Sequence, residues 1–130
     1  MPNPTIRFRI DFGRENSVGP GKIALLEQIG RGRSLSQAAR ELNMSYRRAW
    51  DLLDSLNSGF STPATVSTIG GRRGGGTKLT PLGKQLIRDY RDFDEETQQR
   101  VGTAFRSLNS RAKNRSSEKQ KRRPILGRRS

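Results

Sequence analysis

The chain has 130 residues, enough for one domain, and it contains neither cysteine nor histidine. These two absences exclude disulfides, zinc sites built on Cys or His, and catalytic Ser-His or Cys-His pairs, so we expect neither an enzyme nor a cofactor. With 26 basic and 12 acidic side chains the formal net charge is +14, which predicts a polyanionic partner, most often nucleic acid.

The positive charge is concentrated at the C-terminal end. Residues 111–130 carry nine basic residues and one acid, and their polar composition predicts a disordered tail. We therefore divide the chain into a folded domain at residues 1–110 and a basic tail at residues 111–130. Because no stretch approaches the roughly 18 apolar residues of a membrane span, and the first residues lack the apolar core of a signal peptide, we expect a cytoplasmic protein with no membrane partner.

The first elements follow from hydrophobic periodicity. Residues 5–12 alternate between apolar and charged side chains, which predicts a half-buried strand. A loop is expected at residues 17–21. Residues 22–31 repeat apolar side chains at helical spacing and predict a helix.

Two short helices are predicted next, at residues 35–42 and 46–56. Residues 34–37 read Ser-Leu-Ser-Gln, which is a capping box for the first of them. Asn43 tolerates the left-handed conformation that ends a helix, and Ser45 offers an N-cap for the second helix.

The segment that follows predicts a β-hairpin and a long helix. Residues 64–69 are strand-like, and a short returning strand is expected at residues 77–79 beyond a glycine-rich basic loop at residues 70–76. Thr80 and Pro81 then supply the N-cap and the first residue of the long helix.

The long helix carries an apolar stripe with roughly heptad spacing, and a one-sided stripe of this length needs a cover. We predict that it pairs with the same helix of a second copy in a homodimer. Packing within one chain is the alternative. The residues assigned to the dimer contact are Leu82, Leu86, Tyr90, Phe93, Val101 and Phe105.

Residues 35–54 fit a helix-turn-helix. Ala39 is a small residue where the two helices would cross, Asn43 marks the turn, and apolar residues close the pair. An αα-hairpin in an ordinary helical domain is the alternative. Together with the hairpin, the motif predicts a winged helix-turn-helix, which is a mainly α fold with a small β-wing and a long C-terminal dimerisation helix.

In a helix-turn-helix, the N-terminal residues of the second helix contact base edges in the major groove. Arg47 can pair with the O6 and N7 atoms of guanine, and Ser45 suits a phosphate. For Arg47 and Arg48 a solvated helical face is the alternative. Trp50 is expected to pack half-buried in the core, with DNA contact as the alternative, and Asp51 is expected to orient Arg47 or Arg48. The residues assigned to DNA contact are Ser36, Ser45, Tyr46, Arg47, Arg48, Arg72, Arg73 and Lys78.

The glycine-rich loop and one acidic cluster have other interpretations. Arg72 and Arg73 lie between glycines that let the backbone approach phosphates, whereas a plain disordered loop is the alternative. A nucleotide phosphate loop is not expected, because Thr77 precedes Lys78 where the motif requires Lys first. Residues 92–96 form an acidic cluster that we interpret as a solvated helical surface.

The sequence resembles the N-terminal DNA-binding domain of the ModE family of molybdate-responsive regulators, and more distantly the LysR-type helix-turn-helix. The resemblance implies a dimeric winged helix that binds operator DNA, typically as a repressor of molybdate uptake genes. The C-terminal molybdate-binding domains of the family are not expected here, nor is a small-molecule effector. The matching segments are Ile23-Ala-Leu-Leu-Glu27, Ser34-Leu-Ser-Gln-Ala-Ala39, Met44-Ser-Tyr-Arg-Arg-Ala-Trp-Asp51, Gly70-Gly-x-x-Gly-Gly-Gly76 and Leu79-Thr-Pro-Leu-Gly83.

Two functions fit this sequence. The first is a dimeric regulator that binds double-stranded DNA in a sequence-specific manner. The alternative is an architectural DNA-binding protein that uses its charge without reading sequence.

Overall fold

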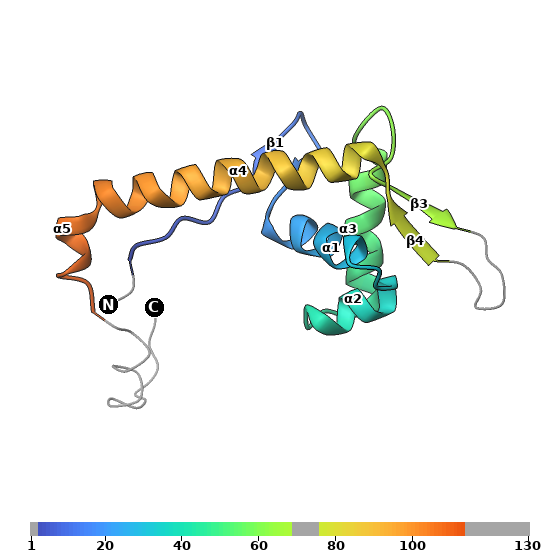
Figure 1. Cartoon of the computed structure of the whole chain (residues 1–130), viewed down its shortest axis with the longest axis horizontal. Coiled ribbons are helices and arrows are strands. Elements are labelled where there is room, and N and C mark those ends of the chain that lie inside the picture. The colour runs from blue at the N-terminus through green and yellow to red at the C-terminus, as the bar shows by residue number, and fades with distance from the viewer. Residues whose placement is uncertain (1–2, 69–75, 114–130) are drawn as a thin grey trace. The chain divides into compact units, whose positions relative to one another are not determined.

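The computed structural model describes residues 3–68 and 76–113 (Figure 1). Their contacts divide the chain into two compact units, Arg7–Glu96 and the combination of Met1–Ile6 with Thr97–Ser130. The elements are β1 Ile10–Asp11, β2 Ser17–Val18, α1 Pro20–Gly30, α2 Leu35–Glu41, α3 Tyr46–Ser58, β3 Thr65–Thr68, β4 Gly76–Leu79, α4 Pro81–Ala104 and α5 Arg106–Asn109.

The strand predicted at residues 5–12 is much shorter in the structure. Only β1 pairs, antiparallel to β2, so that Ile10 lies opposite Val18. The preceding Phe8 instead packs on α4, where its ring stacks on Tyr90 with centroids 4.7 Å apart. The Tyr90 hydroxyl donates a hydrogen bond of 2.9 Å to the Phe8 carbonyl oxygen. The Tyr90 hydroxyl thus hydrogen-bonds the Phe8 carbonyl oxygen, which would otherwise accept a hydrogen bond from a neighbouring strand.

The loop predicted at residues 17–21 is also wrong in part. Ser17 and Val18 form β2, and α1 begins at Pro20 rather than at residue 22. Proline suits this position because its fixed φ fits the first helical turn and its missing N–H has no acceptor there.

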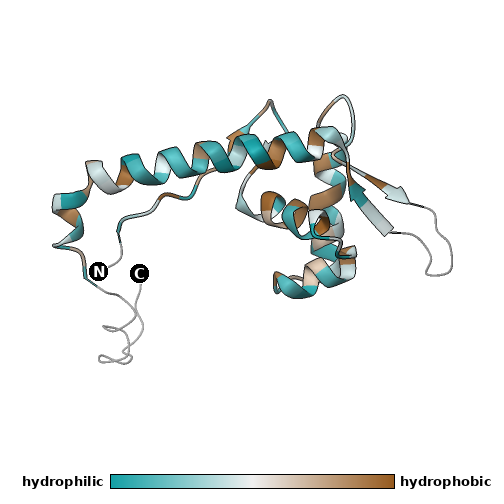
Figure 2. Ribbon diagram, viewed as in Figure 1, coloured by the Kyte–Doolittle hydropathy of each residue, from teal (hydrophilic) through white to brown (hydrophobic). Residues whose placement is uncertain are grey.

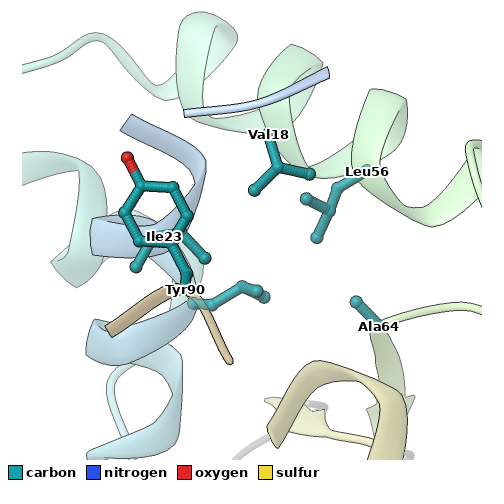
Figure 3. Close-up of a cluster of buried hydrophobic side chains, with 6 residues drawn as sticks. Val18, Ile23, Leu56, Ala64 and Tyr90 are labelled. Atoms are coloured by element: carbon teal, nitrogen blue, oxygen red, sulfur yellow. The ribbon is translucent and has the colours of Figure 1, made fainter. Parts of the chain in front are cut away.

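Helix α1 lies between two apolar clusters and contributes buried residues to both. The first cluster, which we call the upper core, also includes Phe8 and Leu86 at its margin. Figure 3 shows buried side chains of this cluster converging from β2, α1, α3, α4 and the loop before β3. The buried residues of the upper core are Val18, Ile23, Leu26, Leu56, Ala64 and Tyr90.

The second apolar cluster, the lower core, joins α1 to α2 and α3. Its buried residues are Leu25 and Ile29 of α1, Ala38 and Ala39 of α2, and Ala49 of α3. Because α1 fills both cores, it holds α2 and α3 on one side and the start of α4 on the other.

Helix α4 begins as predicted, at Pro81. The Thr80 hydroxyl accepts a hydrogen bond from the Gly83 N–H (3.1 Å) and donates one to the Pro63 carbonyl oxygen (2.8 Å). Gly83 is buried against the loop before β3, where an added Cβ would overlap the Ala64 carbonyl oxygen. The first turn of α4 can approach this loop only because residue 83 has no side chain.

The apolar stripe of α4 is partly used within the chain. Tyr90 is only 7% exposed, and Leu86 packs against the upper core. Both residues belong to the predicted dimer contact, but in the structure they pack within one chain. Phe93 remains 47% exposed although its ring meets Phe8 edge-on.

Arg91 of α4 forms a clamp to α1. Its Nε and Nη2 atoms each lie 2.8 Å from a carboxylate oxygen of Glu27, and its Nη1 lies 3.0 Å from Asp94. The interpretation of residues 92–96 as a solvated acidic surface is therefore wrong for Asp94, whose side chain is 24% exposed and paired.

In the second unit, the Gln98 amide pairs with the backbone of Ile6. Its Nε2 donates to the Ile6 carbonyl oxygen (2.8 Å), and its Oε1 accepts from the Ile6 N–H (3.0 Å). Helix α4 ends at Ala104, and Phe105 separates it from α5 with φ −111° and ψ 20°. The predicted stripe is therefore interrupted at Phe105.

Candidate nucleic-acid interface

Helices α2 and α3 are joined by a short turn that local hydrogen bonds define. The predicted capping box is present, because the Ser34 hydroxyl accepts from the Gln37 N–H (3.1 Å) and the Gln37 side chain accepts from the Ser34 N–H (2.9 Å). Asn43 has φ 55°, the left-handed conformation that the sequence predicts. The Met44 N–H then donates to the Ala39 carbonyl oxygen at 2.9 Å and closes the turn.

The lower core fixes how the two helices cross. Ala39 is 3% exposed and Ala49 is fully buried, so small side chains lie where α2 and α3 meet. Leu42 and Met44, in the turn, pack against the same cluster. The small-residue crossing, the left-handed turn and the apolar seal together confirm the helix-turn-helix.

The N-terminal end of α3 presents polar and basic groups. The Ser45 hydroxyl accepts a hydrogen bond of 3.0 Å from the Arg48 N–H, so Ser45 is the N-cap as predicted. Its hydroxyl hydrogen is still available to a phosphate oxygen. Tyr46, Arg47 and Arg48 follow in the first turn, and all three are exposed.

Arg47 is oriented by a carboxylate one turn further along α3. Its Nε lies 3.3 Å from an Asp51 carboxylate oxygen, which confirms the predicted partner. The Arg47 side chain is nevertheless 82% exposed. Asp51 therefore holds the guanidinium in one orientation, while its terminal N–H groups stay accessible. Bidentate pairing with guanine needs both.

The core packing predicted for Trp50 is not found. Trp50 is 45% exposed, so it is about half-buried as expected, but it belongs to neither core. One indication was present in the sequence. Residues 49, 52, 53 and 56 follow the apolar helical repeat of α3, and position 50 falls outside it.

Strands β3 and β4 form the wing. They pair antiparallel from Thr65 opposite Leu79 to Thr68 opposite Gly76. Lys78 lies directly opposite Val66, and both side chains are exposed on one face of the hairpin. Lys78 therefore adds a positive charge to the exposed face of the wing.

One residue that no sequence motif singles out anchors the wing to α3. Asn57, in the last turn of α3, accepts hydrogen bonds at its Oδ1 from the Ala64 N–H (2.9 Å) and the Thr65 N–H (3.0 Å). Its Nδ2 donates to the Thr65 hydroxyl (2.9 Å). These bonds fix the start of β3 relative to α3.

Of the remaining predicted site residues, the structure describes Ser36 but not Arg72 or Arg73. Ser36 is exposed in the first turn of α2. Arg72 and Arg73 lie outside the described residues, as does the tail from residue 114.

Across residues 3–68 and 76–113, no three acidic, histidine or cysteine side chains are close enough to hold a metal ion. Within the same ranges, no helix combines the length and the apolar character needed to cross a membrane.

Known proteins resemble most of this chain. No protein-family profile matches it. The molybdenum transport protein ModE of Azotobacter vinelandii is 35% identical over 103 residues, which are 79% of this chain and 38% of the relative. The molybdenum-pterin-binding protein MopB of Rhodobacter capsulatus is 38% identical over 92 residues, 71% of this chain and 34% of the relative. The transcriptional regulator ModE of Haemophilus influenzae is 34% identical over 99 residues, 76% of this chain and 38% of the relative.

The matched region is short compared with these proteins. The chain spans 34% to 38% of the length of the three relatives. What the relatives do as whole proteins therefore goes beyond the part that this chain shares with them.

Proposed function

We propose, from the ModE-like sequence and the winged helix-turn-helix structure, that the chain is a transcriptional regulator that binds double-stranded DNA at specific sequences. The observation that carries this proposal is the first turn of α3. There Arg47 is oriented by Asp51 yet almost fully exposed, beside the capped helix N-terminus and Arg48. This combination supplies both phosphate contact and readout of a base edge.

Each assigned residue has a role in this proposal. Arg47 and Tyr46 enter the major groove, while Ser36, Ser45 and Arg48 contact the sugar-phosphate backbone and set the position of α3. Lys78, together with the two wing arginines at 72 and 73, contacts the neighbouring groove or its phosphates.

We also propose a second copy of the chain as its partner and molybdate uptake genes as its targets. Binding as a homodimer is supported by the exposed side chains of Phe93 in α4 and of Phe105 and Leu108 after it, and it places two copies of α3 on one operator. One relative is named a molybdenum transport protein. We therefore propose that the chain represses genes of molybdate uptake.

The decisive experiment is a selection of binding sequences from random duplexes near physiological salt. A palindrome with half-sites about one helical turn apart is the expected result for a dimer of this fold. Recovery of no motif would overturn the sequence-specific function.

Substitution of one arginine then tests the role of α3. Arg47→Ala should lose about 1–3 kcal/mol of discrimination at one base pair of the selected site, while non-specific binding stays nearly unchanged. Arg88→Ala, which removes an exposed arginine from α4, is the matched control. Competition binding with single-base variants of the duplex measures both effects.

The architectural alternative makes a different forecast for the basic tail. If charge alone drives binding, deletion of residues 111–130 should remove most of the affinity on every duplex and flatten its salt dependence. If α3 reads sequence, the deletion weakens binding uniformly but preserves the ratio of specific to non-specific affinity. A salt titration on the selected and a scrambled duplex separates the two.

A further inference from the structure

We infer that Trp50 and Tyr46 form an apolar contact surface for thymine methyl groups in the major groove. This inference rests on the proposed DNA-binding function and extends it from guanine to thymine. It assigns a base-reading role to Trp50, which the structure brings to the exposed face of α3.

The first observation is the exposure of two large aromatic side chains on one helix. Tyr46 is 54% exposed and Trp50 is 45% exposed. They are four residues apart, so their side chains lie one turn above another on the same side of α3. Among the described residues of α3, they are the only large hydrophobic side chains that are exposed.

The second observation is that the core does not need these rings. The buried side of α3 is formed by Ala49 and Leu56, with Leu52 and Leu53 partly buried beside them. An exposed indole loses the favourable free energy that burial of its apolar surface would supply. A ligand that covers the indole recovers that free energy.

The third observation is the charge around the aromatic pair, which selects the kind of ligand. Arg47 and Arg48 follow Tyr46 directly, and the carboxylate next to Trp50, that of Asp51, is paired with Arg47. The pair therefore sits in a positively charged turn that suits a polyanion better than an apolar protein surface.

The chemistry of the groove then identifies the target group. The major groove of DNA presents hydrogen-bonding atoms at every base pair, but its apolar group is the C5-methyl of thymine. An aromatic ring next to a guanine-pairing arginine would read thymine beside guanine. We therefore expect the selected half-site to contain thymine next to the position that Arg47 reads.

The experiment removes the methyl groups and nothing else. Each thymine of the selected duplex is replaced in turn by deoxyuridine, and affinities are measured for the full chain. We expect about fourfold weaker binding for each methyl group that is contacted, from the free energy of burying one such group. Trp50→Ala should weaken binding to the thymine duplex and lower the thymine-to-uracil affinity ratio to about one at the thymines that Trp50 contacts.

Three further variants serve as controls. Arg47→Ala should lower affinity while keeping the thymine-to-uracil ratio. Trp50→Phe should retain most of that ratio, because an aromatic ring remains. Phe12→Ala removes a ring that is 49% exposed and that meets Phe60 beyond the C-terminal end of α3, and it should change neither quantity. Thermal unfolding of each variant checks that the fold is intact.

The possible failures are distinguishable. If a duplex is selected but thymine and uracil forms bind equally, the thymine-methyl inference is wrong and the regulator proposal stands. The same conclusion holds if Trp50→Ala keeps the ratio of the unchanged protein, or if it alters sedimentation without affecting DNA binding. If no duplex is selected, the proposed function and this inference both fail.

Trp50 also provides a direct optical readout. It is the one tryptophan of the chain, so tryptophan fluorescence reports on this position alone. Addition of the selected duplex should shift or quench the emission. An unchanged emission at saturating duplex would show that the indole is not covered by DNA and would overturn the inference.

Discussion

At the scale of single residues, the structure separates arginines that hold the fold from arginines that are available to a ligand. Arg91 donates to two carboxylates and bridges α4 to α1. Arg47 has one longer contact, within its own helix, and is 82% exposed. Both residues carry the same charge, but only Arg47 keeps a free donor edge. This difference supports Arg47 rather than Arg91 as a nucleic-acid contact.

The Arg91 clamp makes the stability of the domain depend on pH. Hydrogen bonding by Arg91 holds the pKa of Glu27 below its ordinary value, although partial burial acts in the opposite direction. A lowered folded-state pKa means that this stabilisation is present above the unfolded-state pKa of about 4.3 and is lost as pH falls through the lower folded value.

We therefore expect Glu27→Gln to destabilise the domain by about 1 kcal/mol at pH 7, a modest value because the Arg91 side chain is 44% exposed. The difference from the unchanged protein should shrink below about pH 4. Urea unfolding at pH 7 and pH 3 measures both. Asp92→Asn, which changes an exposed carboxylate of α4, should have little effect, and an equal loss in both variants would contradict the clamp.

At the scale of elements, α4 contains two glycines in opposite environments. Gly83 is buried against the Ala64 carbonyl oxygen, and a Cβ there would overlap that atom. Gly102 has no heavy atom within 4 Å of the position where its Cβ would be. Position 83 therefore requires glycine for packing, whereas Gly102 carries only the conformational cost of glycine in a helix.

The two positions form a matched pair of predictions. Gly83→Ala should destabilise the domain by about 1–3 kcal/mol, because the loop before β3 must shift. Gly102→Ala should stabilise α4 by up to about 1 kcal/mol, because alanine favours the helix. Thermal unfolding followed by circular dichroism tests both signs. A loss of stability at both positions would show that the space around Gly102 is occupied in solution.

At the scale of the whole molecule, the question is what covers the apolar residues of α4 and the segment after it. Figure 2 shows hydrophobic bands alternating with hydrophilic ones along α4. Tyr90 and Leu86 are covered within the chain. Phe93 and Phe105 are 47% and 49% exposed. The dimer contact that we propose therefore rests on the residues from Phe93 onward.

This assignment changes how dimerisation should be tested. Truncation before residue 80 would remove Tyr90 and expose the upper core, so it would unfold the domain rather than separate two copies. Point substitutions avoid the problem. We expect Val101→Asp and Phe105→Asp each to weaken self-association at least about tenfold, because a buried unpaired charge costs several kcal/mol.

Sedimentation velocity over a range of protein concentrations measures this association. Gln99→Asp, which introduces a carboxylate at another exposed position of α4, is the matched control. Equal sedimentation of all variants would place the contact elsewhere on the chain.

The sequence by itself determined the features that depend on neighbours within a few residues. The capping box of Ser34, the left-handed Asn43, the N-cap at Ser45 and the start of α4 after Thr80 are all confirmed. Each is fixed by backbone sterics or by hydrogen bonds that span three or four positions, and those interactions can be recognised from residue type and spacing.

Tertiary structure decided which side chains are covered. The burial of Tyr90 and the pairing of Arg91 with Glu27 could not be predicted, because each depends on segments distant in the sequence. Phe8 reaches Tyr90 across 82 positions, and Arg91 reaches Glu27 across 64. Periodicity identifies an apolar or polar face of a helix, but the free energy of burial depends on which surfaces meet, and that is a property of the folded chain.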